Sequence, residues 1–254
     1  MERRAYLVHR PLHLIHRPSR LPGLMTLSTH IQRRFALSGM LAPVTFTALA
    51  GAATFVTPDY DLLSDTVSRL AAPGQPYWWL VNASFVIYCL LVQPLGPLLH
   101  SWAPSRIAGA VLWLLIVQYG LGSSLAAVFR VADDHVVIGT LTADNLHHIA
   151  ARVGFVGILT LTLAAPLLLR GVSGHAARWR KWRRFSLAMG LLTVAFMLPF
   201  QLDLLPAWSG LLQRAFFVTT LLWVFGTALW FYRLSALAEG SFPAATRSST
   251  HERS

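Results

Sequence analysis

The chain has 254 residues, of which 55% are hydrophobic and only 12% are charged, and its mean hydropathy is +0.53. Soluble proteins carry about 25% charged residues, so this composition excludes a soluble globular enzyme and a disordered chain. The lone cysteine, Cys89, excludes a disulfide framework and a cysteine-based metal cluster. The composition therefore indicates a multi-pass membrane protein.

Six apolar runs follow one another along the chain. A helix needs about 20 such residues to cross the hydrocarbon core of a bilayer. Because the runs are apolar on every side, they do not resemble the alternating strands of a membrane barrel. The runs cover residues 35–57, 77–99, 107–129, 153–169, 185–202 and 215–232. We therefore expect an all-α polytopic membrane protein, a bundle of six transmembrane helices within residues 35–233.

The basic residues predict the orientation of this bundle. Seventeen of the 21 lysines and arginines lie before the first span, in the loops after the second and fourth spans, or after the sixth. The other four are Arg69, Arg130, Arg152 and Arg214. The positive-inside rule then places both termini in the cytoplasm and the protein in the cell membrane. Because this topology and anionic lipids account for the net charge of +11, we expect membrane lipids as partners and no nucleic acid.

The flanking segments are expected to lie outside the bundle. Residues 1–34 are predicted to form a basic cytoplasmic tail, and residues 234–254 a disordered cytoplasmic tail. Translation starting at Met25 and signal cleavage after the small residues at 48–50 both remain open. The tail also contains histidines at positions 9, 13, 16 and 30, but Pro11 disfavours the helix that would align them around a metal.

Seven of the ten acidic residues fall on the expected extracytoplasmic side, in three segments. The first is residues 58–74, where Leu63, Val67 and Leu70 recur at helical spacing opposite Asp61, Ser64, Asp65, Ser68 and Arg69. This pattern predicts a short interfacial helix over residues 64–70, with an i,i+4 pair between Asp65 and Arg69. The segment is either a lid over the bundle or a simple connector.

The second segment, residues 130–148, leads into the fourth span. Asp144 lies three residues before His147 and four before His148, so a helix would bring it within reach of both. Adjacent histidines project about 100° apart, so only one is expected to face a shared cavity. Arg152 lies one turn beyond His148, where an arginine is costly unless it finds a partner. We expect Asp144, Asp203 or Asp65 to supply that partner.

The third segment is the hairpin of residues 201–214, in which Asp203 and Arg214 could pair with each other. We predict that Asp65, Asp144, His148 and Arg152 converge beneath the outer surface and that Asp203 and Arg214 close the far side. The predicted ligand-binding set is Asp61, Ser64, Asp65, Ser68, Asp144, His147, His148, Arg152, Asp203 and Arg214. The same cluster could instead be a structural network of ion pairs.

Several of these residues carry a family resemblance. Residues 58–61 and 64–70, Asn82, the run 120–124 and the pair 147–148 are similar to the domain-of-unknown-function 998 family of bacterial and archaeal integral membrane proteins. The resemblance covers roughly residues 35–233. This chain has Ser68 to Ala71 where the family has a serine-x-leucine-glycine pattern. The resemblance implies six helices and polar outer loops, without an established activity.

Three more specific chemistries are alternatives. Asp65, Asp144 and His148 are candidate ligands for the metal of a membrane lipid hydrolase, although no second His-x3-His follows in the spans. Ser64 or Ser68 with His148 could form a catalytic serine site, but no nucleophile-elbow sequence is present. A small-molecule transporter would need charged residues at the membrane midplane, which four of the six spans lack. No cofactor is expected, and the sequence favours a lipid-binding or scaffolding protein.

Overall fold

The fold is a bundle of long helices, seen in a computed structural model that describes residues 27–170 and 176–240. Six helical segments in this part of the chain are long and apolar enough to cross a membrane, as predicted. The helices are α1 (Thr29–Val56), α2 (Trp78–Val92), α3 (Leu95–Trp102), α4 (Arg106–Val128), α5 (Ala143–Leu168), α6 (Ala176–Gln201) and α7 (Ser209–Gly240). The chain is therefore a multi-pass membrane protein.

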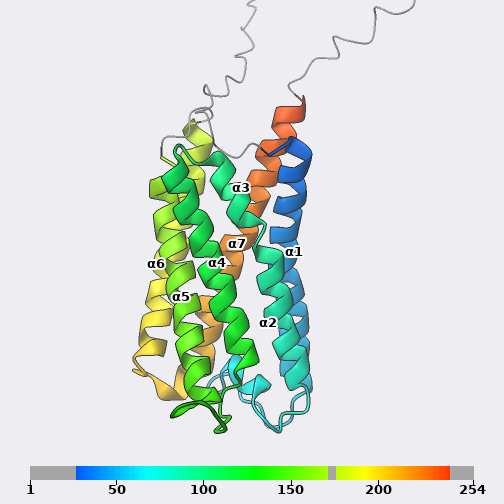
Figure 1. Ribbon diagram of the computed structural model, residues 1–254, viewed down its shortest axis with the longest axis vertical. Coiled ribbons are helices and arrows are strands. Elements are labelled where there is room, and N and C mark those ends of the chain that lie inside the picture. Colours follow the sequence, from blue (N-terminus) through cyan, green and yellow to red (C-terminus); the bar gives the residue numbers. More distant parts are fainter. Residues whose placement is uncertain (1–26, 171–175, 241–254) are drawn as a thin grey trace, which may run out of the picture.

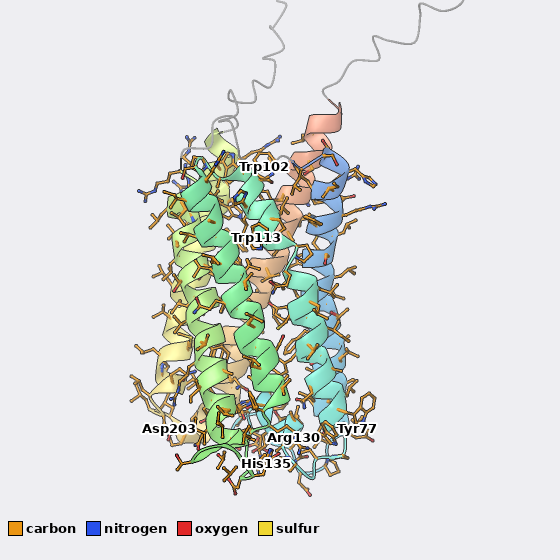
Figure 2. All side chains as sticks on the ribbon, in the orientation of Figure 1. Tyr77, Trp102, Trp113, Arg130, His135 and Asp203 are labelled. Carbon is orange, nitrogen blue, oxygen red and sulfur yellow. The ribbon has the colours of Figure 1, made fainter. Side chains whose placement is uncertain are left out.

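The helices run side by side along the long axis of the molecule (Figure 1). α1 packs on α2 and α7, α4 packs on α5, and α6 packs on α7. We call the end that contains Val56, Trp78, Ala143 and Gln201 the cavity end, and the opposite end the terminal end. Figure 2 shows Tyr77, Arg130, His135 and Asp203 at the cavity end, and Trp102 and Trp113 toward the terminal end.

Local sequence explains where several helices begin. Ser28 and Ser105 accept hydrogen bonds from backbone N–H groups in the first turns of α1 and α4. Thr142 and Asn145 form a reciprocal capping box at the start of α5, with both N···O distances at 3.2 Å. These side chains satisfy N–H groups that have no partner within their own helix.

The second span is divided where a single helix was expected. α2 ends at Val92 and α3 begins at Leu95, because Pro94 cannot donate a backbone hydrogen bond. The side chain of Gln93 donates to the carbonyl oxygens of Cys89 (3.3 Å) and Ile116 (3.4 Å) at the break. Breaks of this kind are tolerated in membranes where the freed backbone groups find partners inside the protein.

The first and last helices extend further than the apolar runs that predicted them. α1 begins at Thr29 rather than near residue 35, and α7 continues to Gly240 beyond residue 233. Polar contacts join the two extensions: Arg33 donates to the Tyr232 hydroxyl at 2.8 Å, and Ser235 to Gln32 at 3.1 Å. The rest of the expected tails, with His9, His13 and His16, lies outside the described residues.

Small residues bring α4 and α5 into close contact. A Cβ atom on Gly122 would lie 2.4 Å from the backbone nitrogen of Gly154. A Cβ atom on Gly157 would likewise lie 3.1 Å from the backbone nitrogen of Tyr119. Close backbone approach of this kind is how membrane helices gain van der Waals contact. The helices α4 and α5 are therefore closely packed along this face.

The expected interfacial helix is shorter and more buried than predicted. The segment between α1 and α2 contains a 3-10 helix, η1 (Val67–Ala71), and residues 62–64 form a turn before it. The Asp61 carboxylate accepts from the backbone of Leu63 and Ser64 and from the Ser64 hydroxyl, and so competes with a helix. Val67 and Leu70 are buried at 6% and 1% exposure, while Leu63 is 47% exposed.

Two further short elements lie at the cavity end. Strands β1 (Val136–Ile138) and β2 (Leu141–Thr142) form an antiparallel hairpin between α4 and α5. Gly139 begins its tight turn with φ of +59°, a conformation that L side chains rarely adopt. A 3-10 turn, η2 (Pro206–Trp208), leads into α7. The sequence analysis did not predict either element.

Candidate functional site

A cavity of about 290 Å³ opens at the cavity end of the bundle. It is bounded by α2, α4, α5, α6 and α7, and by η1 and the loop after α6. His148 and Arg152 line the cavity and are both exposed, so the cavity communicates with its surroundings. The volume approaches the range of about 300 to 1,000 Å³ that is typical of small-molecule sites.

The cavity wall combines polar side chains with aromatic rings. The polar lining residues are Thr66, Ser68, Asn82, Ser123, His147, His148, Arg152, Gln201, Asp203, Ser209 and Gln213. The aromatic lining residues are Phe85, Phe155, Phe200 and Phe217. Phe85, Phe155 and Phe217 also line a second void of only about 20 Å³, together with Phe46, Tyr88 and Phe216. These rings form the floor of the cavity, so its polar lining gives way to an aromatic layer toward the bundle centre.

His147 is held by the end of α4. Its Nδ1 atom lies 2.7 Å from the carbonyl oxygen of Ala126 and 2.8 Å from that of Phe129. Carbonyl oxygens only accept hydrogen bonds, so Nδ1 must carry the proton. When the ring is neutral, its Nε2 atom is therefore unprotonated and can accept a hydrogen bond from a molecule in the cavity.

His148 also lines the cavity, which corrects the expectation that only one of the two histidines faces it. The rings of His147 and His148 meet edge to face, with centroids 5.4 Å apart. The Nε2 atom of His148 lies 3.6 Å from Asp144 Oδ1, as the i,i+4 spacing predicted. The same Asp144 oxygen accepts from the backbone nitrogen of Ala132 at 2.7 Å, so Asp144 also ties the α4–α5 loop to the start of α5.

Arg152 differs most from expectation. Nine residues after Ala143, it lies about 14 Å along α5 at about 1.5 Å per residue. We expected an acidic partner, but within residues 27–170 and 176–240 the Arg152 side chain forms no hydrogen bond or ion pair. Asp65 instead pairs with Arg69, at 2.5 Å, and Asp144 contacts His148. Because an arginine in a membrane span costs about 2.5 kcal/mol or more, an unpaired one facing a cavity calls for an explanation.

The loop between α1 and α2 is fastened to the start of α7, mainly by Arg214. The Arg214 guanidinium donates to the carbonyl oxygens of Leu62 (3.0 Å) and Asp65 (2.8 Å) and to the Tyr60 hydroxyl. Gln213 accepts from the backbone nitrogen of Val67 at 2.5 Å. Arg214 thus holds a loop that forms one wall of the cavity, and it does not line the cavity or pair with Asp203 as the sequence suggested.

Partial burial raises the pKa of Tyr60, whose hydroxyl accepts from Arg214, and the positive charge of Arg214 partly opposes this effect. The predicted pair between Asp65 and Arg69 is present, and Asp65 Oδ2 also accepts from the backbone nitrogen of Asp61. Asp61 stays at the surface, where the hydrogen bond from the Ser64 hydroxyl is the main reason its pKa lies below the ordinary value. Tyr60, Asp61 and Asp65 therefore shape the loop between α1 and α2 and do not themselves line the cavity.

The predicted set is therefore only partly brought together. Ser68, His147, His148, Arg152 and Asp203 line one cavity. The other predicted residues, Asp61, Ser64, Asp65, Asp144 and Arg214, hold the surrounding loops. Asp203 has φ of +50°, and within the described chain its carboxylate forms no hydrogen bond or ion pair.

The sequence analysis missed several lining residues, above all Asn82, Gln201 and Gln213. The Oδ1 atom of Asn82 is buried without a hydrogen-bond partner in the described structure. Asn82 and Gln201 are amides within apolar runs, a signal that could have identified them, because buried polar groups in membranes usually face the protein interior. Gln213 lies just before the sixth run, where no such signal is present. The Asn82 oxygen is therefore a buried acceptor that needs a donor.

The more specific chemistries gain no support from this arrangement. In the part of the chain that the structure describes, no three His, Cys, Asp or Glu side chains are placed to hold a metal ion. Ser64 donates to Asp61, and Ser68 pairs with Thr66 at 3.1 Å, so their described partners do not include a histidine. The narrow aromatic layer below the cavity does not favour a transport path.

Comparison with known proteins identifies one similarity. The family model described as a protein of unknown function, DUF998, matches residues 40–230, which include all the cavity-lining residues. No curated protein and no solved structure shows significant similarity to the chain.

Proposed function

The chain belongs to the DUF998 family of proteins of unknown function, and from that premise we propose that it binds an amphiphilic ligand, such as a membrane lipid, in the cavity. The observation that carries this proposal is the pairing of a polar lining with a phenylalanine floor in a cavity of about 290 Å³. Ligand sites typically combine an apolar wall with a few convergent polar groups. An amphiphile matches both parts of the wall.

The cavity volume fits a head group and the first part of a hydrocarbon chain better than a whole lipid. The exposure of Arg152, which lies well inside a membrane span, supports a cavity that is open toward the side of the bundle. The remainder of a hydrocarbon chain would then stay in the bilayer. Such a mode of binding needs no movement of the α4–α5 wall.

We further propose that both termini lie in the cytoplasm of the cell and that the cavity faces the opposite side of the cell membrane. The excess of basic residues at the terminal end supports this orientation. Cys89 is buried and should not react with an impermeant maleimide, so single introduced cysteines can report the topology. In intact cells, an impermeant maleimide should label Val137→Cys, which is 42% exposed in the hairpin, and not Arg180→Cys. The reverse labelling pattern would contradict the orientation.

The binding proposal is tested by filling the cavity. Ala151 lines it from α5, and the matched control, Ala110, is exposed on α4. We expect Ala151→Trp to lose most of the lipid that wild-type protein retains in mild detergent, as measured by native mass spectrometry. Ala110→Trp should retain it. Equal retention by both variants, or no retained amphiphile in wild type, would refute the proposal.

A further inference from the structure

The cavity contains two opposite charges that do not neutralise each other. Arg152 and Asp203 both line it, and neither side chain forms a hydrogen bond or ion pair in the described chain. Arg152 is the one lysine or arginine among the lining residues, and Asp203 is the one aspartate. A zwitterionic ligand, with its anionic group at Arg152 and its cationic group at Asp203, would satisfy both.

The two charges are also staggered along the bundle. Asp203 lies at the cavity end of the molecule (Figure 2), beyond the last residue of α6. Arg152 lies deeper, about 14 Å along α5 from its first residue. Phe155 follows Arg152 in α5 and belongs to the aromatic floor. From the floor outward, the wall therefore offers an apolar surface, then a cation, then an anion.

This order matches an amphiphile in which a phosphate joins the hydrocarbon part to an outer amine. The guanidinium of arginine has five N–H donors in a planar fork that suits phosphate oxygens. Two acceptors in the wall have no hydrogen-bond partner in the described chain: the carboxylate of Asp203 and the buried Oδ1 of Asn82. Acceptors of this kind favour an ammonium with N–H donors over a quaternary ammonium, which has none.

We propose that the cavity is a binding site for a phosphate ester that carries a primary ammonium group, with Arg152 binding the phosphate and Asp203 binding the ammonium. This inference rests on the proposed function and names the class of ligand. The chemistry is shared by a phosphoethanolamine lipid and by free phosphoethanolamine. Only the lipid would also use the phenylalanine floor.

The test measures binding to purified wild-type protein in neutral detergent by native mass spectrometry. The probes are phosphatidylethanolamine, phosphatidylcholine, phosphatidylglycerol and phosphatidic acid with identical acyl chains, and soluble phosphoethanolamine. We expect phosphatidylethanolamine to bind at least tenfold more tightly than phosphatidylcholine and phosphatidylglycerol. Soluble phosphoethanolamine should bind far more weakly. If it binds as tightly as the lipid, the head-group assignment stands, but the amphiphile proposed above is wrong.

Two variants separate the two charges. Arg152→Gln should weaken binding of every phosphate lipid by about tenfold to a hundredfold, because a hydrogen bond to a charged group is lost. Asp203→Asn should weaken only phosphatidylethanolamine, to the level of phosphatidic acid. Asparagine also tolerates the positive φ at this position, so the backbone should be unchanged.

The chain offers a matched control for each variant. Arg34→Gln removes an exposed positive charge at the terminal end, and Asp59→Asn removes an exposed aspartate with φ of +54° outside the cavity. Both controls should bind like wild type. The inference is overturned if phosphatidylcholine or phosphatidylglycerol binds as well as phosphatidylethanolamine, or if Arg152→Gln changes affinity by less than twofold. In that case loss of binding in Ala151→Trp would still support an amphiphile site.

Discussion

The two ends of the bundle both contain clustered aromatic rings and use them in different ways. At the terminal end, Trp179 contacts Trp182, Trp230 and Phe231 edge to face, with ring centroids 5.6 to 6.2 Å apart. Trp182 and Phe231 are almost completely buried. At the cavity end, four phenylalanines border an open volume of about 290 Å³.

The difference arises from what accompanies the rings. At the terminal end, large rings of neighbouring helices fill the space against one another, and the Trp182 indole donates to Thr227 at 3.3 Å. At the cavity end, the loop from α1 to α2 is anchored on α7, and the charged side chains of Arg152 and Asp203 face the cavity. The closely packed terminal end therefore supports the fold, whereas the cavity end has space for a ligand.

The largest effect should come from removing a ring at the terminal end. Trp182→Ala should lower the free energy of unfolding by about 3 to 5 kcal/mol, because it leaves a void where packing was complete. Phe200→Ala, at the cavity end, should cost less, because that ring already borders open space. Thermal unfolding in detergent measures both. A larger loss of stability in Phe200→Ala than in Trp182→Ala would contradict this difference between the two ends.

A smaller effect should follow from disturbing the contact between the loop and α7. A Cβ atom on Gly210 would lie 2.4 Å from the carbonyl oxygen of Asp65, so Gly210→Ala must displace the loop. We expect a loss of about 1 to 3 kcal/mol, typical of overpacking, and weaker ligand retention. Gly51→Ala is the control, because a Cβ atom there meets nothing within 4 Å. Wild-type stability in Gly210→Ala would show that the loop is not fixed.

Replacing Arg214, which fastens the α1–α2 loop to α7, should have a more local effect. Arg214→Lys keeps the positive charge but loses the planar fork that reaches Leu62, Asp65 and Tyr60. We expect a stability loss of about 1 kcal/mol, with faster protease cleavage confined to residues 57–77. Arg69→Lys, which keeps one ion-pairing nitrogen for Asp65, should change neither. Unchanged cleavage in Arg214→Lys would show that Arg214 does not hold this loop on α7.

The smallest effect concerns the hairpin at the cavity end. A hydrogen bond from His135 is the main reason that the pKa of Asp133 lies below its ordinary value, and Arg130 contributes as well. A carboxylate with a lowered pKa stabilises the folded state above its unfolded pKa of about 4, and this contribution disappears as the pH falls through the folded pKa. Proteolysis of the hairpin should therefore increase only below about pH 4. Asp133→Asn should remove this pH dependence, and persistence of the dependence would exclude Asp133 as its origin.

The apolar runs alone determined the class of this protein and its six spans. This was possible because a helix in lipid must satisfy its own backbone hydrogen bonds, so length and hydropathy are sufficient. The glycines at 122 and 154 lie where α4 and α5 approach each other closely, since small residues permit backbones to approach. Local pairs followed from spacing in the same way, as with Asp65 and Arg69 or Asp144 and His148.

The cavity was determined only by the tertiary structure. The sequence predicted Asp144, Asp203 or Asp65 as the partner of Arg152. In the structure Asp65 pairs with Arg69, Asp144 contacts His148 and the backbone of Ala132, and the Asp203 carboxylate forms no ion pair within the described chain. Which loop folds onto which helix depends on contacts between residues about 150 positions apart, as between Arg214 and Leu62. Neither periodicity nor charge encodes such a contact locally. The spans were predictable because each responds to the membrane by itself, whereas the site exists only where several of them meet.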